Sequence, residues 1–377
     1  MGQPGDVERV FVQCSPGLEG VLEAEARSLG RVQRVTSGVE VEGLPGVHAQ
    51  AVLVLRVAER VLLRLMEVPA RRWEEVESAV TAASLDRVAA PGAAVTLETA
   101  VRMPSAPTPR ALAALLARRW RRPVQVGRRQ GREEGGSRLL LRVAEGRASL
   151  SADVGGEFLH RRGWRQETSR APMRETLAAG VLSLAGYAPD RPLRDLVCGS
   201  GTLVIEAALA ARSISPGLGR SFAAEQWPEA AQLDWAGRRD RLRVAVRGHA
   251  PASILGSDLN AGALGTARRN ARRAGVLEDL QLERVDLASA VPGTSVSGLV
   301  VGNLPYGLRV GVRGELEALD AALARTLAVA FGGWRKALLV DDEARLARAG
   351  GIKPDRVHRL VNGGIPVVLG VWDAERR

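Results

Sequence analysis

The chain has 377 residues, of which 46% are hydrophobic and 25% charged, and these values are typical of a globular protein with two or three domains. No apolar run approaches the roughly 20 residues of a transmembrane helix, and the N-terminus lacks the pattern of a secretory signal, so we expect a cytoplasmic protein without membrane contact. Two distant cysteines and four scattered histidines argue against a disulfide framework or a metal site, whereas the net charge of +11 favours a polyanionic partner.

The first part of the chain mixes predicted strands and helices and has the character of an α+β region with two small units. A good helix start stands at Thr108-Pro109, where an N-cap residue precedes a proline in the first turn. The periodicity predicts helices over residues 18–29, 52–65, 73–84 and 110–119. It predicts strands over residues 9–13, 39–41, 95–101, 124–126, 138–143 and 147–153.

A basic stretch lies in this region. Residues 99–132 contain nine arginines and no carboxylate, and Trp120 stands among the arginines. Cations also favour a helix C-terminus, but a helix end alone does not need nine of them. Guanidinium groups with an embedded aromatic ring suit a nucleic-acid backbone with stacked bases. We therefore predict RNA contacts from Arg118, Arg119, Trp120, Arg121, Arg122, Arg128 and Arg129.

From about residue 171 the chain alternates regularly between strands and helices, which predicts a parallel sheet covered by helices. The expected strands are residues 193–197, 254–257, 280–285, 298–302, 337–340, 357–361 and 367–372. The segment between the last two strands is too short for a crossover helix. These strands should therefore form a hairpin, which gives a seven-stranded Rossmann-like α/β sheet with one antiparallel strand.

A glycine-containing loop follows the first strand of this sheet. Asp195 ends the strand, and the loop Cys198-Gly199-Ser200-Gly201-Thr202 leads into a helix. Glycines let the backbone approach a ligand closely, and the helix start offers free N–H groups. A dinucleotide-binding loop would carry a third glycine and cradle a pyrophosphate. An aspartate beside the loop instead suits a cationic cofactor such as S-adenosylmethionine.

The next three strands also end in side chains that accept hydrogen bonds. Asp258, followed by Leu259, is placed to bind two ribose hydroxyls, and Asp286 to receive an adenine amine. Asp258 lies 63 positions after Asp195, which predicts an insertion, supplied by residues 211–250. An isolated aspartate is more often a cap or turn residue. A series of such residues at strand tips, where open α/β sheets bind ligands, favours a cofactor site.

The fourth strand runs into Asn303-Leu304-Pro305-Tyr306. The Asn303 side chain and the carbonyl before Pro305 can both accept hydrogen bonds from an exocyclic amine, and the Tyr306 ring offers a stacking face. Proline restricts Leu304 to extended geometry, so these acceptors lie on a stiff edge. An Asn-x-Pro turn alone is common, but beside a cofactor loop this segment predicts the methyl-transfer site, with Asn303 also near the cofactor.

With these residues in place, the chain resembles the class I S-adenosylmethionine-dependent methyltransferases. More narrowly, it resembles the THUMP-domain RNA methyltransferases of the guanine exocyclic amine, and most of all their bacterial ribosomal-RNA branch. The resemblance rests on the segments Phe11–Glu19, Asp153–Arg165, Ala171–Glu175, Cys198–Thr202 and Pro216–Phe222. It implies a ferredoxin-like unit over residues 1–65, a THUMP unit that grips RNA over 66–157 and a class I methyltransferase domain over 158–377.

The resemblance also implies S-adenosylmethionine as cofactor, structured RNA as partner, and methylation of a guanine that is flipped out of its stack. The family usually carries Asn-Pro-Pro-Tyr, whereas Leu304 stands in the second position here, as in the ribosomal-RNA adenine dimethyltransferases. Those enzymes lack the N-terminal units and the insertion. Transfer RNA as substrate and adenine-N6 methylation of RNA or DNA remain alternatives. An oxidoreductase or a catalytically silent assembly factor fits the strand tips less well.

Overall fold

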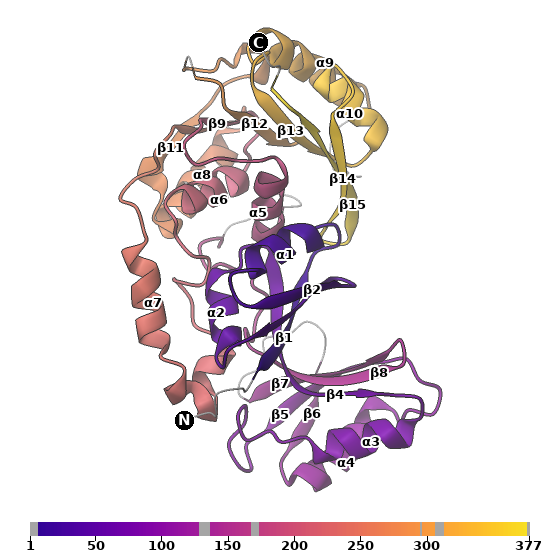
Figure 1. The fold of residues 1–377 in the computed structure, drawn as a ribbon. Coiled ribbons are helices and arrows are strands. Elements are labelled where there is room, and N and C mark those ends of the chain that lie inside the picture. The colour runs from indigo at the N-terminus through magenta and orange to yellow at the C-terminus, as the bar shows by residue number, and fades with distance from the viewer. Residues whose placement is uncertain (1–6, 128–135, 167–172, 295, 306–312, 375–377) are drawn as a thin grey trace.

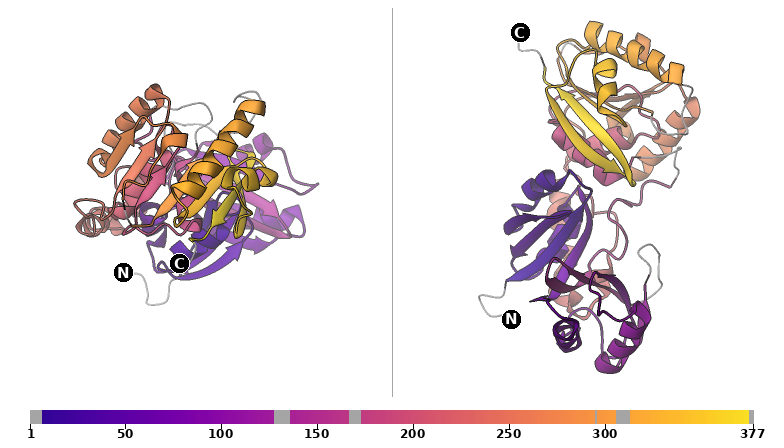
Figure 2. Two further views of the ribbon diagram at one scale, coloured as in Figure 1. Left: turned by 90° about the horizontal axis from the view of Figure 1, so that it is seen from above. Right: turned by 90° about the vertical axis from the view of Figure 1, so that its right-hand side faces the viewer.

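The computed structural model describes residues 7–127, 136–166, 173–294, 296–305 and 313–374. It is elongated, with the C-terminal sheet at one end and the N-terminal sheet at the other (Figures 1 and 2). No helix among the described residues is long and apolar enough to cross a membrane. The two parts meet at helices α1 (Glu19–Ala26) and α5 (Glu175–Leu184), where the side chain of Leu18, the residue before α1, packs against Gly180 on α5.

The N-terminal region forms one sheet of eight strands in the order β2-β3-β1-β4-β8-β7-β5-β6. Its strands are β1 Glu8–Cys14, β2 Arg31–Val35, β3 Gly38–Gly43, β4 Ala58–Pro69, β5 Val95–Val101, β6 Val124–Val126, β7 Ser137–Ala144 and β8 Arg147–Asp153. Its helices are α1 Glu19–Ala26, α2 Val47–Val54, α3 Trp73–Ala82 and α4 Pro109–Trp120. All neighbouring strands are antiparallel except β5 with β6 and β5 with β7.

The helix predicted over residues 52–65 is wrong. Helix α2 ends at Val54, and from Ala58 the chain is the long strand β4. Residues 58–63 are all buried because β4 lies between β1 and β8 in the middle of the sheet. A strand buried on both faces loses the alternation of polar and apolar residues, so its apolar positions can mimic helical spacing. Strand β2, with mostly exposed residues, was not predicted.

Strand β4 crosses the proposed boundary between the two N-terminal units. Its first half pairs with β1, from Ala58 to Leu63, and its second half pairs with β8 as far as Pro69. The two units therefore share one continuous sheet. The division at residue 65 remains a proposal.

The C-terminal sheet has seven strands in the order β11-β10-β9-β12-β13-β15-β14, and β15 is antiparallel to its neighbours. The prediction of seven strands with one antiparallel member is confirmed. The strands are β9 Leu193–Asp195, β10 Ile254–Ser257, β11 Leu280–Glu283, β12 Leu299–Asn303, β13 Arg335–Val340, β14 Arg356–Asn362 and β15 Ile365–Trp372. The α-helices are α5 Glu175–Leu184, α6 Thr202–Ala211, α7 Trp235–Val244, α8 Ala261–Ala274, α9 Arg313–Val329 and α10 Glu343–Gly350.

The predicted insertion lies between α6 and β10 and runs back along the N-terminal sheet (Figure 1). It holds the short helices η1 Ala223–Gln226 and η2 Pro228–Gln232, followed by α7. Its backbone bonds to the N-terminal region, with Gly217 N donating to Leu53 O at 3.1 Å. The side chain of Arg238 on α7 donates to Gln50 on α2 at 3.1 Å. The insertion therefore ties the C-terminal sheet to the N-terminal region.

A buried charge network reinforces this junction. His48 is fully buried, with Nδ1 2.6 Å from Glu8 Oε1 and Nε2 3.4 Å from Glu229 Oε1. Arg87 bridges the same two carboxylates, at 2.5 Å to Glu8 and 2.6 Å to Glu229. Burial alone raises the pKa of Glu8, but hydrogen bonds and charge from His48 and Arg87 outweigh it and lower that pKa to about 2.

We expect Glu8→Gln to destabilise the protein at neutral pH by about 3 kcal/mol. This is the free energy that corresponds to lowering the pKa of Glu8 from 4.5 to about 2. The folded pKa lies below the unfolded one, so this stabilisation is present above about pH 4.5 and is lost as the pH falls toward 2. The difference in unfolding midpoint between wild type and variant, measured by urea denaturation, should shrink from pH 6 to pH 3. Glu23→Gln, at a surface ion pair with Arg34, serves as control and should show a much smaller effect.

Candidate active site

Three neighbouring strands bring the predicted site residues to one edge of the sheet. Strand β9 pairs in parallel with β10 on one side and with β12 on the other. In this register Asp195 lies opposite Gly256 and opposite Val301. Because all three strands run in the same direction, the loop after Asp195, the Asp258 side chain and Asn303 all follow at the same carboxyl edge.

The loop between β9 and α6 makes a tight turn. Gly199 and Gly201 have φ angles of +53° and +87°, which glycine adopts without strain. A Cβ atom at Gly201 would lie 3.0 Å from the Cβ of Ala267 on α8, so the loop also packs closely against that helix. The Cys198 N–H donates to Ser257 O at 2.9 Å, which fixes the loop to the neighbouring strand. Cys198, Ser200 and Thr202 are buried.

Asp258 connects the loop to the second strand. One carboxylate oxygen accepts the N–H of Gly199 at 2.9 Å, and the other accepts the N–H of Asn260 at 2.8 Å. Each oxygen has two lone pairs, so one acceptor position on each remains for a ligand. A ribose diol needs this pair of acceptors. Leu259, the next residue, is 57% exposed and presents an apolar surface.

Asp195 is a buried carboxyl group, only 1% exposed. Burial, partly opposed by the Val197 N–H and assisted by the nearby Asp258, raises the pKa of Asp195 to about 7. Within the part of the chain that the structure describes, no cation pairs with Asp195. A buried carboxylate without a cationic partner destabilises the folded state, and a positively charged ligand would compensate for this.

Asp286 lies beyond the end of β11 and not at the tip of this strand, where the sequence predicted it. Strand β11 ends at Glu283, and Asp286 is exposed. Its side chain accepts the N–H of Ala288 at 2.9 Å and caps the short helix η4 (Leu287–Ser289). One carboxylate oxygen is engaged in this cap, and the other has no recorded partner among the described residues.

The predicted amine site is described as far as Pro305, and Tyr306 lies outside the described residues. The Asn303 Oδ1 atom is buried and has no hydrogen-bond partner among the described residues. Leu304 is 1% exposed, and its N–H donates to Leu339 O at 3.0 Å. Its carbonyl receives no hydrogen bond from a described residue. Two adjacent residues at the sheet edge thus each carry an acceptor that has no donor among the described residues.

Two arginines at this edge were missed by the sequence reasoning. Arg165 donates to the Thr202 hydroxyl at 2.6 Å and lies 3.2 Å from Glu175, so it holds the start of α6. Arg345 donates to the carbonyl of Pro305 at 2.6 Å. In a chain so rich in arginine, nothing in the local sequence distinguishes these two.

The predicted RNA-contact residues fall into three groups. Arg118, Arg119 and Arg121 are exposed at the C-terminal end of α4, and Trp120 beside them is half-buried. Arg122 is buried instead, with Nη1 3.3 Å from Ala90 O, so it supports the fold and we withdraw it from the RNA surface. Arg128 and Arg129 lie outside the described residues.

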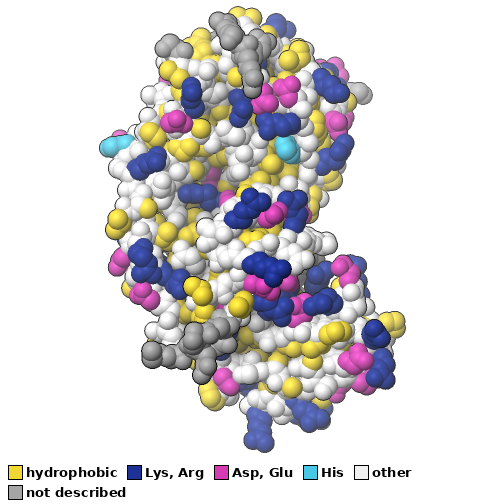
Figure 3. Space-filling model, viewed as in Figure 1, with side chains coloured by type: hydrophobic (Ala, Val, Ile, Leu, Met, Phe, Trp, Pro, Cys, Tyr) yellow, Lys and Arg dark blue, Asp and Glu magenta, His cyan; other side chains and the backbone are white. Residues whose placement is uncertain are grey.

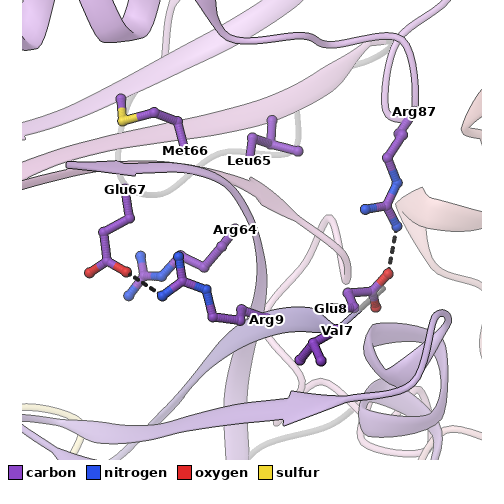
Figure 4. A pocket seen from close by; sticks show the side chains of 8 residues that line it. All are labelled: Val7, Glu8, Arg9, Arg64, Leu65, Met66, Glu67 and Arg87. Atoms are coloured by element: carbon purple, nitrogen blue, oxygen red, sulfur yellow. Dashed lines mark hydrogen bonds and ion pairs between the residues drawn. The ribbon is translucent and has the colours of Figure 1, made fainter. Parts of the chain in front are cut away.

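A separate pocket of about 210 Å³ lies in the N-terminal region (Figure 4). It is lined by Val7, Glu8, Arg9, Arg64, Leu65, Met66, Glu67 and Arg87. Arg9 pairs with Glu67 at 3.0 Å, and Arg87 with Glu8. Arg64 pairs with Glu40 at 2.7 Å, so each charged group of the pocket has an ion-pair partner within the protein, and none of the lining residues comes from the C-terminal sheet.

Comparison with known proteins finds related methyltransferases. Residues 162–369 match the family described as RMKL-like, methyltransferase domain, and residues 9–62 match the RlmL ferredoxin-like domain. The ribosomal RNA large subunit methyltransferase K/L of Syntrophotalea carbinolica is 33% identical over 392 residues, which cover 98% of this chain and 54% of that protein. The chain thus spans about half the length of this relative.

Two crystal structures resemble the whole chain. A putative methyltransferase, SMU.472, complexed with SAH, is 26% identical, with a TM-score of 0.86 and coverage of 98% of this chain and 99% of that one. A predicted N6-adenine-specific DNA methylase from Listeria monocytogenes is also 26% identical, with a TM-score of 0.83 and coverage of 98% and 97%. The chain belongs to the family of RMKL-like methyltransferase domains, preceded by a ferredoxin-like domain of the RlmL type.

Proposed function

We propose that the protein transfers a methyl group from S-adenosylmethionine to the exocyclic amine of a guanine in ribosomal RNA. The observation that carries this proposal is the buried Asn303 Oδ1 at the sheet edge, which has no hydrogen-bond partner among the described residues. A buried acceptor without a donor is unfavourable unless a ligand supplies one. The name of the Syntrophotalea relative, a ribosomal RNA methyltransferase, supports RNA as the substrate.

The residues around the loop fit S-adenosylmethionine. The buried Asp195 carboxyl, whose pKa is raised to about 7, would become negatively charged when a cationic cofactor binds beside it. The two acceptor positions of Asp258 that no described residue occupies match a ribose diol. Leu259 offers an apolar face, and Asp286 an acceptor for the adenine amine. Cys198, Gly199, Ser200, Gly201 and Thr202 form the backbone turn that approaches the cofactor. The crystal structure of SMU.472 contains SAH, the product form of this cofactor.

The two hydrogen-bond acceptors of the protein would act by positioning the substrate amine. The lone pair of a guanine amine is delocalised into the ring, which makes the amine a poor nucleophile. Hydrogen bonds from its two N–H groups to Asn303 Oδ1 and the Leu304 carbonyl would localise this pair and orient it. Bound S-adenosylmethionine would supply an electrophilic methyl group, whose bond to sulfur breaks as its bond to the amine nitrogen forms, and the amine would then lose one proton. Alignment of the amine with this methyl group would account for much of the rate. Tyr306 is proposed to stack on the flipped base.

Asn303→Ala should lower turnover by at least about 100-fold, because the amine loses one of two positioning acceptors. The dissociation constant for S-adenosylmethionine, measured by calorimetry, should change little, because the cofactor contacts lie mainly on the neighbouring strands. Asn303→Asp keeps an acceptor oxygen and should retain part of the activity. A large loss of cofactor affinity in the alanine variant would contradict this role. Binding of S-adenosylmethionine, and not of NAD, separates the proposal from an oxidoreductase.

Adenine-N6 methylation is the second candidate. It is favoured by Leu304 in place of the usual proline and by the similarity to the Listeria protein, a predicted N6-adenine-specific DNA methylase. Mass spectrometry of nucleosides from ribosomal and transfer RNA of a deletion strain distinguishes the candidates. Loss of a methylguanosine from ribosomal RNA supports the proposal, loss from transfer RNA changes the substrate, and loss of a methyladenosine supports the second candidate.

We further propose that residues 66–157 form a THUMP unit that grips the RNA through phosphate contacts and shape. On the face shown in Figure 3, Arg and Lys side chains occur along the whole length of the molecule, including the end where α3 and α4 lie. The exposed Arg118, Arg119 and Arg121 at the end of α4 are the described residues we expect to contact RNA, with Trp120 between them.

Replacing Arg118, Arg119 and Arg121 together with glutamine should weaken RNA binding in a salt-dependent way. Each lost phosphate contact should reduce the slope of log affinity against log salt by about 0.7 to 0.9. Filter binding with ribosomal RNA at several salt concentrations measures this slope. A matched control replaces Arg27, Arg31 and Arg34, which pair with Glu23 and Glu42 and give the same change in net charge. Equal weakening in both variants would argue against the α4 surface.

A further inference from the structure

A buried arginine reaches the backbone of the proposed amine site from a neighbouring helix. Arg345 lies in the first turn of α10, and its side chain is 4% exposed. Its Nη1 donates to the Pro305 carbonyl at 2.6 Å and lies 3.5 Å from Asp341 Oδ1. Its Nε and Nη2 donate to Asp320 on α9 at 2.8 to 3.0 Å. One guanidinium therefore joins two helices and the loop.

The charge of this arginine is compensated locally. The Asp320 carboxylate is 2% exposed and receives the guanidinium through both of its oxygens. Arg348 lies 3.9 Å from the same carboxylate, at the partly exposed side of the pair. A bidentate pair of this kind holds the guanidinium plane in one orientation. The orientation of the Arg345 Nη1 donor toward the Pro305 carbonyl is thus fixed by contacts within the protein and does not require a bound ligand.

The loop from Asn303 to Pro305 is restrained at nearly every backbone torsion. The N–H of Leu304 is bonded to Leu339 O, and the Leu304 side chain is buried in a cluster with Leu196 and Leu338. The ψ angle of a residue before proline is confined to extended values, and the proline ring fixes its own φ angle. The remaining soft torsion is ψ of Pro305, which orients the carbonyl that Arg345 binds.

We propose that Arg345, held by Asp320, is a positioning residue for methyl transfer, because it fixes the Pro305 carbonyl and thereby anchors the residue that is bonded directly to the Leu304 carbonyl. The inference rests on the proposed function, since the acceptors of Asn303 and Leu304 act only there. Arg345 bonds to backbone and not to the reacting atoms. Lysine could not replace it, because a single ammonium cannot hold the Asp320 carboxylate in fork geometry and reach Pro305 in a fixed direction.

A structural role of the pair must be separated from this positioning role. Arg345→Met alone leaves Asp320 buried without its partner and destabilises the fold. The double variant Arg345→Met with Asp320→Leu removes both charges and restores apolar packing between α9 and α10. It still lacks the donor to Pro305. Stability and catalysis are thereby uncoupled.

The test measures methyl transfer from radiolabelled S-adenosylmethionine to large-subunit ribosomal RNA from a deletion strain. We expect kcat to fall at least about 30-fold in both the single and the double variant, since small displacements at a reacting centre cost this much or more. The thermal midpoint should fall in the single variant and recover in the double. The dissociation constant for S-adenosylmethionine should stay within about threefold of wild type. Recovery of kcat together with the midpoint would overturn the proposal.

A matched control uses another partly buried arginine in the same domain. Arg212 lies 3.3 Å from Asp279 and donates to the Gly275 carbonyl at 2.8 Å, away from the loop. Arg212→Met should lower the thermal midpoint without lowering kcat. Asn303→Ala in the same assay separates the two proposals. If this variant is fully active, the proposed function fails; if it is inactive while the double variant keeps wild-type kcat, only the role of Arg345 fails.

Discussion

The parallel pairing of β9 with both β10 and β12 is the constraint on which the site depends. Because all three strands run in one direction, the chain leaves each of them at the same edge of the sheet. The glycine loop, Asp258 and Asn303 come together there although more than a hundred residues separate Asp195 from Asn303. The close packing of Gly201 against α8, the bond from Gly199 to Asp258 and the bond from Cys198 to Ser257 all follow from this register.

Arginines connect this edge to the rest of the molecule. Helix α6, which begins at the glycine loop, is held near its start by Arg165, in its middle by Arg162 through Glu206, and at its end by Arg56, which donates to Ile214 O at 2.6 Å. Arg162 also donates to the Arg56 carbonyl, so the N-terminal region and the loop share one network. Many arginine side chains therefore form contacts within the protein. Net charge alone overstates the basic surface that is available to the proposed RNA partner.

The site keeps two features that a fold selected only for stability would avoid. Asp195 is a buried carboxyl group without a cationic partner, and Asn303 Oδ1 is a buried acceptor without a donor within the described residues. Groups of this kind are unfavourable in an empty site and become favourable when a ligand supplies the missing charge or hydrogen bond. They lie on adjacent strands, which suits a cationic methyl donor on one side and an amine on the other. Such local conflicts are typical of functional sites.

The sequence by itself determined the seven strands of the C-terminal sheet, its single antiparallel member, the insertion and the polar residues at the ends of β9, β10 and β12, whereas Asp286 lies beyond the end of β11. These features are visible because each depends on local periodicity or on a residue at the end of an element. Only the tertiary structure decided that residues 58–65 are a central strand and not part of a helix, because burial between β1 and β8 erases the alternation that marks a strand. It also decided which arginines are structural. Arg122 and Arg345 differ from exposed arginines only in their distant partners, and those partners are set by long-range packing.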